Sequence, residues 1–483
     1  MRRTLGVAFR LGLLASGAPA MLAAQAAFDR TKPPTLPAAP KLVLPSVISS
    51  RLGNGIGLQV VTQPELPLVQ VTLVVAGGSR LDGTEPGRAS FMARMLTESA
   101  GGKDVNALQS ELAFLGANLS AASSWDAFTV SLNVPKRSLG AALDLMADVV
   151  QRPAFTAADV RRQRELRAAS ILQRRDQPNA IASLAYSAIV FPAGHPYHNS
   201  IDGDSLTTSR LDSASVRAFY ERAFVPARAK FIVVGDISAS DAGAMLASRF
   251  SAWKAAGTPL PMSAVTVSPV DNTGVKLFLI DKPGAAQSVI SLGGPGVSRF
   301  SADYPALVVM NTLLGDSFSS RLNQNLRETK GYTYGIGSRF QWAPVPGPFR
   351  ISTGVRTDVT DSSIVEVFRE LHAIQDAPVN AVELGRAKAY VALAIPGNFE
   401  TNGGIAGQLV ELNTFGLPLT SVSEFIARVN LVSAADVQRV AKKYLPVNRA
   451  TVVVVGDLAK IRAGIDALKL GTSTVLDAAA VAK

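Results

Sequence analysis

The chain has 483 residues, a length sufficient for two or three domains that each bury a core. Hydrophobic residues make up 47% and charged residues 18%, a balance that is typical of globular proteins and excludes a disordered or fibrous chain. The absence of cysteine excludes disulfides and a cysteine-linked lipid anchor. The formal net charge is +11.

Residues 1–26 have the three parts of a secretory signal peptide. Arginines precede an apolar run from Leu11 to Ala24, and a small-x-small cleavage site ends at Ala26. The run is shorter than the roughly 20 residues that a membrane-spanning helix needs, so cleavage is favoured over a short membrane anchor. We therefore expect export to the periplasm without stable membrane insertion. Removing the three arginine charges of this segment from +11 leaves +8 for the remainder.

A cluster of arginines gives the densest positive patch. Its members are Arg161, Arg162, Arg164, Arg167, Arg174 and Arg175. Aromatic residues do not interleave with them, as a surface for single-stranded nucleic acid requires. We interpret the cluster as a solvated helix face and expect no nucleic-acid partner.

The predicted elements begin after a proline-rich leader at residues 27–45. Asn54-Gly55 indicates a hairpin turn. Residues 68–76 form an apolar strand that ends in two glycines, and a helix follows from about Gly87 to Thr97. The same order returns at residues 288–314, as a strand, two glycines, a loop and a helix.

An internal repeat links the two halves of the chain. Residues 223–237 and 443–458 both contain a proline turn, an apolar strand and a Gly-Asp turn, and a helical pattern precedes each copy. Gly235 and Gly456 are 221 positions apart, and Pro226 and Pro446 are 220 apart. Four features in the same order indicate that the second half repeats the first.

These patterns predict an α+β protein of two homologous domains, each a mainly antiparallel sheet covered by helices. We expect the first domain at residues 46–256, a linker at 257–274 and the second domain at 275–470. Residues 471–483 are rich in small residues, and we expect them to form a flexible tail.

The chemistry-bearing residues do not form a self-contained catalytic set. The chain has three histidines, His195, His198 and His372, and the first two flank a Pro-Tyr pair that indicates a loop. A third ligand is not evident near them, so a structural role is favoured over metal binding.

A helix-to-strand corner offers two hydrogen-bond donors. Residues 316–330 are predicted to form a helix that ends at Gly331, and residues 332–340 a strand. Arg327 and Tyr334 would reach one surface there, aimed at a carbonyl or an oxyanion. On this segment alone, an arginine at a helix end and a packed tyrosine are the favoured interpretation.

Several segments together carry a family resemblance. Residues 87–96 run Gly-Arg-Ala-Ser-Phe-Met-Ala-Arg-Met-Leu, and residues 326–334 run Leu-Arg-Glu-Thr-Lys-Gly-Tyr-Thr-Tyr. With the landmarks at 115–119 and 152–155, they resemble the insulinase/pitrilysin family of zinc peptidases, the inverzincins, which include the mitochondrial processing peptidase. The resemblance runs from about Arg51 to Leu458 and implies two homologous domains that form half of a clam-like chamber.

The resemblance implies that the zinc site is degenerate. The family places His-x-x-Glu-His where this chain has Ser90, Ala93 and Arg94, so both histidines and the catalytic glutamate are replaced. The third ligand, a glutamate, corresponds to Ser170. We expect no metal in this chain, and the cationic Arg94 would repel Zn²⁺.

By the same resemblance, the second half of the chain retains two residues of the family's active site. The family's Arg/Tyr pair corresponds to Arg327 and Tyr334, which the resemblance implies contact the scissile peptide. The chain is then not active alone. It is expected to be the substrate-binding subunit of a heterodimeric zinc metallopeptidase, whose homologous partner supplies zinc and the general base for cleavage of extended peptides. The alternative is an inactive homologue that binds peptides or scaffolds an envelope complex.

Overall fold

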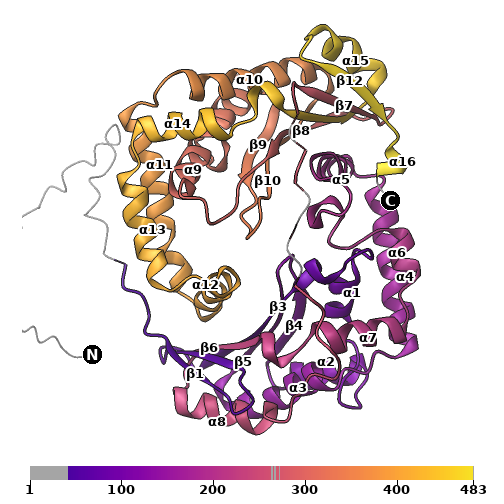
Figure 1. The fold of residues 1–483 in the computed structure, drawn as a ribbon, viewed down its shortest axis with the longest axis vertical. Helices are drawn as coiled ribbons and strands as arrows, with labels where there is room; N and C mark the ends of the chain where they lie inside the picture. The colour runs from indigo at the N-terminus through magenta and orange to yellow at the C-terminus, as the bar shows by residue number, and fades with distance from the viewer. Residues whose placement is uncertain (1–41, 263–264, 266–267, 271, 482–483) are drawn as a thin grey trace, which may run out of the picture. The chain divides into compact units, whose positions relative to one another are not determined.

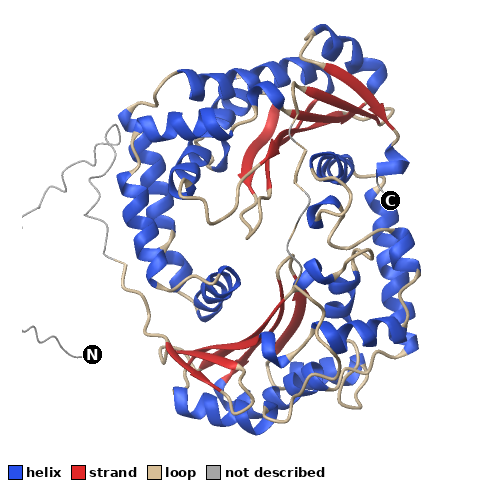
Figure 2. Cartoon of the chain, in the orientation of Figure 1, coloured by secondary structure: helices blue, strands red, loops and turns tan. Residues whose placement is uncertain are grey.

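The structure is a computed structural model that describes residues 42–262, 265, 268–270 and 272–481. The predicted signal peptide, its cleavage site and most of the proline-rich leader lie outside these residues. The described part contains two six-stranded sheets with helices packed against them (Figures 1 and 2). The predicted class of two similar α+β halves is confirmed.

The first sheet has the strand order β1-β2-β6-β3-β5-β4. Its strands are β1 (Ile48–Arg51), β2 (Gly57–Thr62), β3 (Leu68–Ala76), β4 (Asn118–Ser123), β5 (Ala127–Pro135) and β6 (Ala229–Gly235). The pair β2–β6 is parallel and the other four pairs are antiparallel. The predicted hairpin joins β1 to β2, and Gly55 there has φ +89°, a backbone conformation that favours glycine.

The second sheet has the order β12-β7-β11-β8-β10-β9. Its strands are β7 (Lys276–Asp281), β8 (Gln287–Pro295), β9 (Thr333–Phe340), β10 (Pro348–Arg356), β11 (Thr451–Gly456) and β12 (Thr472–Leu476). The pairs β12–β7 and β7–β11 are parallel, and the other three are antiparallel. Each sheet therefore has a sequence-repeat strand, β6 or β11, near its centre, where it is buried on both faces.

Helices cover both sheets. The first half contains α1 (Arg88–Met95), α2 (Val105–Phe114), α3 (Leu139–Gln151), α4 (Ala157–Arg174), α5 (Pro178–Val190), α6 (Ser205–Ser209), α7 (Ser213–Ala223) and α8 (Ala239–Phe250). The second half contains α9 (Tyr304–Asn311), α10 (Thr360–Asp376), α11 (Ala381–Ala394), α12 (Asn402–Phe415), α13 (Thr420–Leu431), α14 (Ala434–Tyr444), α15 (Leu458–Ala467) and α16 (Ala478–Val481). Two π-helical segments, η5 (Thr312–Asp316) and η6 (Asn323–Thr329), follow α9.

The two copies of the internal repeat have the same helix cap, the same short turn and the same buried strand. Helices α7 and α14 each begin with a capping box, in which Asp212 and Ser433 accept a hydrogen bond from the third helical residue. Each helix then leads through a short 3-10 turn into a buried strand. Two separate apolar cores result, one for each sheet.

The two halves exchange one helix each. Helix α5 packs on strands β8 and β11 of the second sheet, and helix α12 packs on β3 and β6 of the first, as Figure 1 shows. Tyr186 of α5 donates a hydrogen bond of 2.6 Å to the carbonyl of Phe349. From α12, Asn413 donates to the Gln59 side chain at 2.7 Å. The halves are thus joined by reciprocal contacts as well as by the linker.

Two predictions of local structure are wrong. The tail after residue 471 was expected to be flexible, but β12 extends the second sheet because its backbone pairs with β7. The helix predicted over residues 316–330 begins only at Arg321 and is largely π-helical. Phe318 consequently does not join Leu322 and Leu326 on a buried face and is 65% exposed.

Candidate functional site

Arg327 and Tyr334 lie side by side at the predicted corner. The Arg327 guanidinium carbon is 5.5 Å from the centre of the Tyr334 ring and 4.3 Å from that of Phe318. Tyr334 is 90% exposed, and its hydroxyl has no hydrogen-bond partner among the residues that the structure describes. Two aromatic faces therefore hold the guanidinium by cation–π attraction. Its Nε also lies 3.6 Å from a carboxylate oxygen of Glu328, whereas the Tyr334 hydroxyl remains available to a ligand.

The corner is held from beneath by Asn323. Its side-chain amide donates to the Ile336 carbonyl at 2.8 Å, and its oxygen accepts from the Ile336 amide at 3.3 Å. Leu322 and Leu326 anchor η6 in the core on the same side. Gly331 then turns the chain with φ +63°. Because η6 and β9 are fastened together, Arg327 and Tyr334 have a fixed relative position.

A break in strand register turns Tyr334 outward. Strand β9 pairs with β10, but the register shifts between Thr353 and Val355, so that Tyr334 and Gly335 together lie opposite Gly354. Such a bulge interrupts the alternation of buried and exposed side chains. Tyr334 and Gly335 are consequently both exposed, at the edge of the sheet.

The first half brings three of the four degenerate zinc positions together. Ser90 and Arg94 of α1 and Ser170 of α4 line one cavity of about 410 Å³, which we call the arginine pocket. Ala93 is buried in the core and does not line the cavity. The Ser90 hydroxyl donates to the Gly87 carbonyl at 3.1 Å. Three of the positions at which the resemblance predicts zinc-site residues therefore share one cavity, where the side chains are two serines and an arginine.

These residues do not fit Zn²⁺. Zinc in proteins is bound by imidazole, thiolate or carboxylate, and the pocket offers two hydroxyls and a guanidinium at the ligand positions. Within residues 42–481, as far as the structure describes them, no group of three His, Cys, Asp or Glu side chains is placed to hold a metal ion. A guanidinium beside the metal position would add electrostatic repulsion.

Two further arginines line the pocket, which corrects part of the sequence interpretation. Arg167 and Arg174 belong to the cluster that was assigned to a solvated helix face, yet both side chains point into the fold. Arg167 donates to the Gly87 carbonyl at 2.7 Å and stacks on Phe91. Burial lowers the pKa of Arg167; the charges of Asp202 and Asp82 oppose this shift, and those of Arg174 and Arg94 add to it. The sequence could have indicated this arrangement, because Arg167 lies three residues before Ser170 and Arg174 four residues after it, on one face of the helix.

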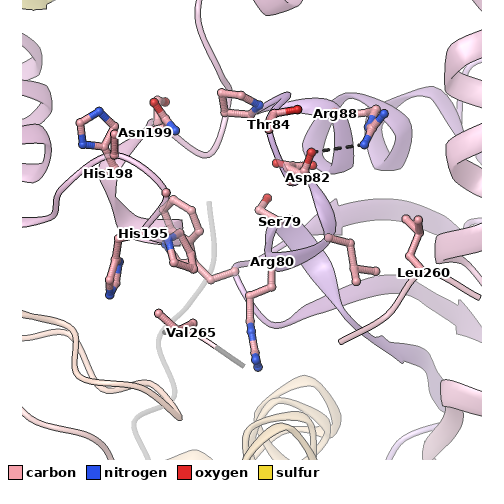
Figure 3. A pocket seen from close by; sticks show the side chains of 18 of the residues that line it. Ser79, Arg80, Asp82, Thr84, Arg88, His195, His198, Asn199, Leu260 and Val265 are labelled. Carbon is pink, nitrogen blue, oxygen red and sulfur yellow. Dashed lines mark hydrogen bonds between the residues drawn. The ribbon is translucent and has the colours of Figure 1, made fainter. Parts of the chain in front are cut away.

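A larger cavity of about 800 Å³ lies at the start of α1 (Figure 3). Asp82 forms part of its wall and accepts hydrogen bonds from the amides of Gly87 and Ala89 at 3.0 and 2.7 Å. Burial outweighs these bonds and raises the pKa of the Asp82 carboxyl to about 7. No pattern in the sequence indicates this perturbed carboxyl, because only the fold buries it.

His195 and His198 border the same cavity, in and beside the 3-10 helix η3 (Pro196–His198). The Nδ1 atom of His195 accepts from the Tyr197 amide at 3.1 Å, and burial lowers the pKa of His195 to about 4. The Nδ1 atom of His198 is 2.6 Å from the Phe191 carbonyl. Both rings therefore have local packing partners, as expected of structural histidines.

Comparisons with known proteins agree with this geometry. Residues 60–195 match the model of the insulinase family (peptidase family M16), and residues 210–391 match that of the peptidase M16 inactive domain. The chain is 28% identical to a solved M16 inactive domain from Pseudomonas fluorescens, with a TM-score of 0.78 over 85% of this chain and 98% of that one.

Curated relatives include zinc proteases. An uncharacterized zinc protease of Mycobacterium tuberculosis is 29% identical over 58% of this chain, and the match spans 64% of that protein's length. A probable mitochondrial-processing peptidase subunit beta of Arabidopsis thaliana is 23% identical over 80% of this chain and 75% of its own.

The chain belongs to the insulinase family, peptidase family M16, and resembles the beta subunit of the mitochondrial processing peptidase. The match to the inactive-domain model and to a solved inactive domain supports an inactive homologue within that family. Among the described residues, no helix combines the length and the apolar character that crossing a membrane requires.

Proposed function

We propose that the chain is the substrate-binding subunit of a heterodimeric zinc metallopeptidase of the periplasm. The observation that carries the proposal is the pairing of Arg327 with the exposed Tyr334, in a chain whose first half has serine and arginine where the resemblance places zinc ligands. A homologous partner would provide the metal and the general base. This chain's residues would bind the peptide and direct two donors at the carbonyl that reacts.

The position of Tyr334 supports binding of an extended peptide. Strand β9 is the last strand of its sheet. Asn323 and Asn311 already bond the outer backbone groups of Ile336 and the carbonyl of Ser338, so a peptide would bind through the exposed side chains at the bulge and not by strand pairing. A peptide seated there would pass the Tyr334 hydroxyl and the Arg327 guanidinium. Because Asn323 fixes both elements, little reorganisation would accompany binding.

The test is substitution in the complex with the zinc-bearing partner. Arg327→Ala and Tyr334→Phe should each lower kcat/KM for peptide cleavage by about 10²- to 10³-fold, the effect typical of a lost oxyanion donor. Arg462→Ala and Tyr390→Phe, which change exposed residues of α15 and α11, are the matched controls. Neither pair should alter the affinity of the two chains for each other. Unchanged cleavage in the first pair would contradict the assigned roles.

Export is part of the proposal and has its own test. N-terminal sequencing of the mature chain from the periplasmic fraction should begin close to residue 27. An intact Met1 in the cytoplasmic fraction would contradict export.

A further inference from the structure

The arginine pocket has an excess of positive charge. Three arginines line it, Arg94, Arg167 and Arg174, against a single acidic residue, Asp202, so the lining carries a net charge of +2. Like charges gathered in one cavity raise the energy of the empty pocket, and an anion would relieve it.

Two of the guanidinium groups, those of Arg167 and Arg174, are hydrogen-bonded only to neutral groups. Arg174 donates to the Ser200 hydroxyl at 2.9 Å and the Gly203 carbonyl at 3.4 Å, while its Nε is buried without a hydrogen-bond partner. Arg167 donates to the backbone carbonyls of Gly87 and Asp202. These bonds fix the positions of the guanidinium groups, whose charge is partly offset by the nearby carboxylates of Asp82, Asp202 and Asp204.

Arg94 is the most accessible of the three. Its side chain is exposed, and its guanidinium has no hydrogen-bond or ion-pair partner within the part of the chain that the structure describes. The resemblance places a zinc-binding histidine at this position, so a cationic side chain replaces a metal ligand here. A guanidinium presents parallel N–H donors that match the two oxygens of a carboxylate.

An edge strand borders the pocket. Ala121, Ala122 and Ser123 of β4 line it, and β4 is the last strand of the first sheet. The outer backbone groups of such a strand can pair with an extended peptide. A peptide on this edge would carry its end or one of its side chains into the cavity.

We propose that the arginine pocket binds a carboxylate of an extended peptide, either the C-terminal carboxylate or that of an Asp or Glu side chain. The inference rests on the proposed peptide-binding function and deepens it by naming the substrate class. Arg94 would meet the carboxylate from the open side, and Arg167 and Arg174 from below. Ser170, which also lines the cavity, offers a hydroxyl donor.

Binding of a matched peptide set to the mature chain, without a partner, tests this by calorimetry. One octapeptide has a free C-terminus and no acidic residue, a second is its C-terminal amide, and two further amides contain Glu or Gln at one central position. A charge-assisted pair should make a carboxylate-bearing peptide bind about 10- to 100-fold more tightly than its neutral counterpart. Preference for the free terminus or for Glu identifies the source of the carboxylate.

Two variants complete the test. Arg94→Gln should remove most of the preference and leave the neutral amides unaffected, and Arg94→Glu should reverse it toward a peptide with Lys at the central position. Arg161→Gln, on the same helix as Arg167 but outside the pocket, should change nothing. Equal binding of all four peptides, or a preference that survives Arg94→Gln, would overturn the inference. The proposed subunit function is tested separately, by the effect of Arg327→Ala on cleavage by the complex. Failure of the carboxylate-binding inference is therefore distinguishable from failure of the proposed function.

Discussion

The hydroxyl of Tyr186 in α5 donates a hydrogen bond of 2.6 Å to the carbonyl oxygen of Phe349 in β10, so a helix of the first half is anchored in the sheet of the second. The ring itself is fully buried, in a cluster of residues from both halves. Arg350, next to that carbonyl, donates to Ser183 of the same helix at 2.8 Å. The contact between the halves therefore combines apolar burial with specific polar bonds.

Removing that hydroxyl should destabilise the protein modestly. Tyr186→Phe keeps the buried ring but loses the hydrogen bond to Phe349, so we expect the free energy of unfolding to fall by about 1–2 kcal/mol. Denaturant unfolding measures it. Tyr390→Phe, at a half-exposed position on α11, should stay within about 0.5 kcal/mol of wild type. An equal loss in both variants would contradict the assigned anchor.

The buried carboxyl of Asp82 predicts a pH dependence of stability. Its pKa rises from 3.8 to about 7 in the folded chain. Between these pH values the folded state keeps a proton that the unfolded state has lost, so its contribution to stability falls as the pH rises. Relative to Asp82→Asn, which cannot titrate, the wild type should lose about 3 kcal/mol of unfolding free energy from pH 4 to pH 7. Parallel curves for the two proteins would contradict a raised pKa.

The degenerate zinc site should be repairable. Because Ser90, Arg94 and Ser170 already share one cavity, the triple variant Ser90→His, Arg94→His, Ser170→Glu should bind one Zn²⁺ per chain. The absorption bands of Co²⁺ as a substitute metal and competition with a chromophoric chelator measure this. Arg94→His alone, with one ligand, is the control. Failure of the triple variant would show that the backbone no longer presents the family's ligand geometry.

Phe318 should support the Arg/Tyr pair through its ring. A cation–π contact at an exposed site contributes about 0.5–1 kcal/mol, so Phe318→Ala should lower kcat/KM of the complex by roughly 2- to 5-fold. Phe318→Tyr keeps the aromatic face and should retain activity. Phe114→Ala, which removes an 89% exposed ring from α2, is the matched control. A loss in the tyrosine variant as large as in the alanine variant would argue against the stacking role.

Much of the fold could be predicted because its signals are local. The buried strands β3, β6 and β11 appear as mainly apolar runs, and the capped helices α7 and α14 repeat at a fixed spacing. The exchange of α5 and α12 could not be predicted, because a helix's apolar face does not specify which sheet it covers. The tail strand β12 was missed since its Thr/Ser-rich sequence has little apolar character.

The candidate site also has features that could be predicted from the sequence and features that could not. The proximity of Arg327 and Tyr334 follows from a short connection, which sequence spacing can reveal. The exposure of Tyr334 depends on the bulge opposite Gly354, and the stacking of Phe318 depends on the late start of the helix. Arg167 and Arg174 were misjudged because their burial comes from the loop at residues 200–203, which is distant in sequence.

The central claim is that this chain works with a zinc-bearing homologue, and purification of the tagged mature chain from its native host tests it most directly. We expect a second chain of the same family at equal stoichiometry, with an intact His-x-x-Glu-His motif and one bound zinc per complex. Mass spectrometry and metal analysis measure both. Recovery of this chain alone, or with unrelated envelope proteins and no zinc, would contradict the account and favour a peptide-binding or scaffolding subunit.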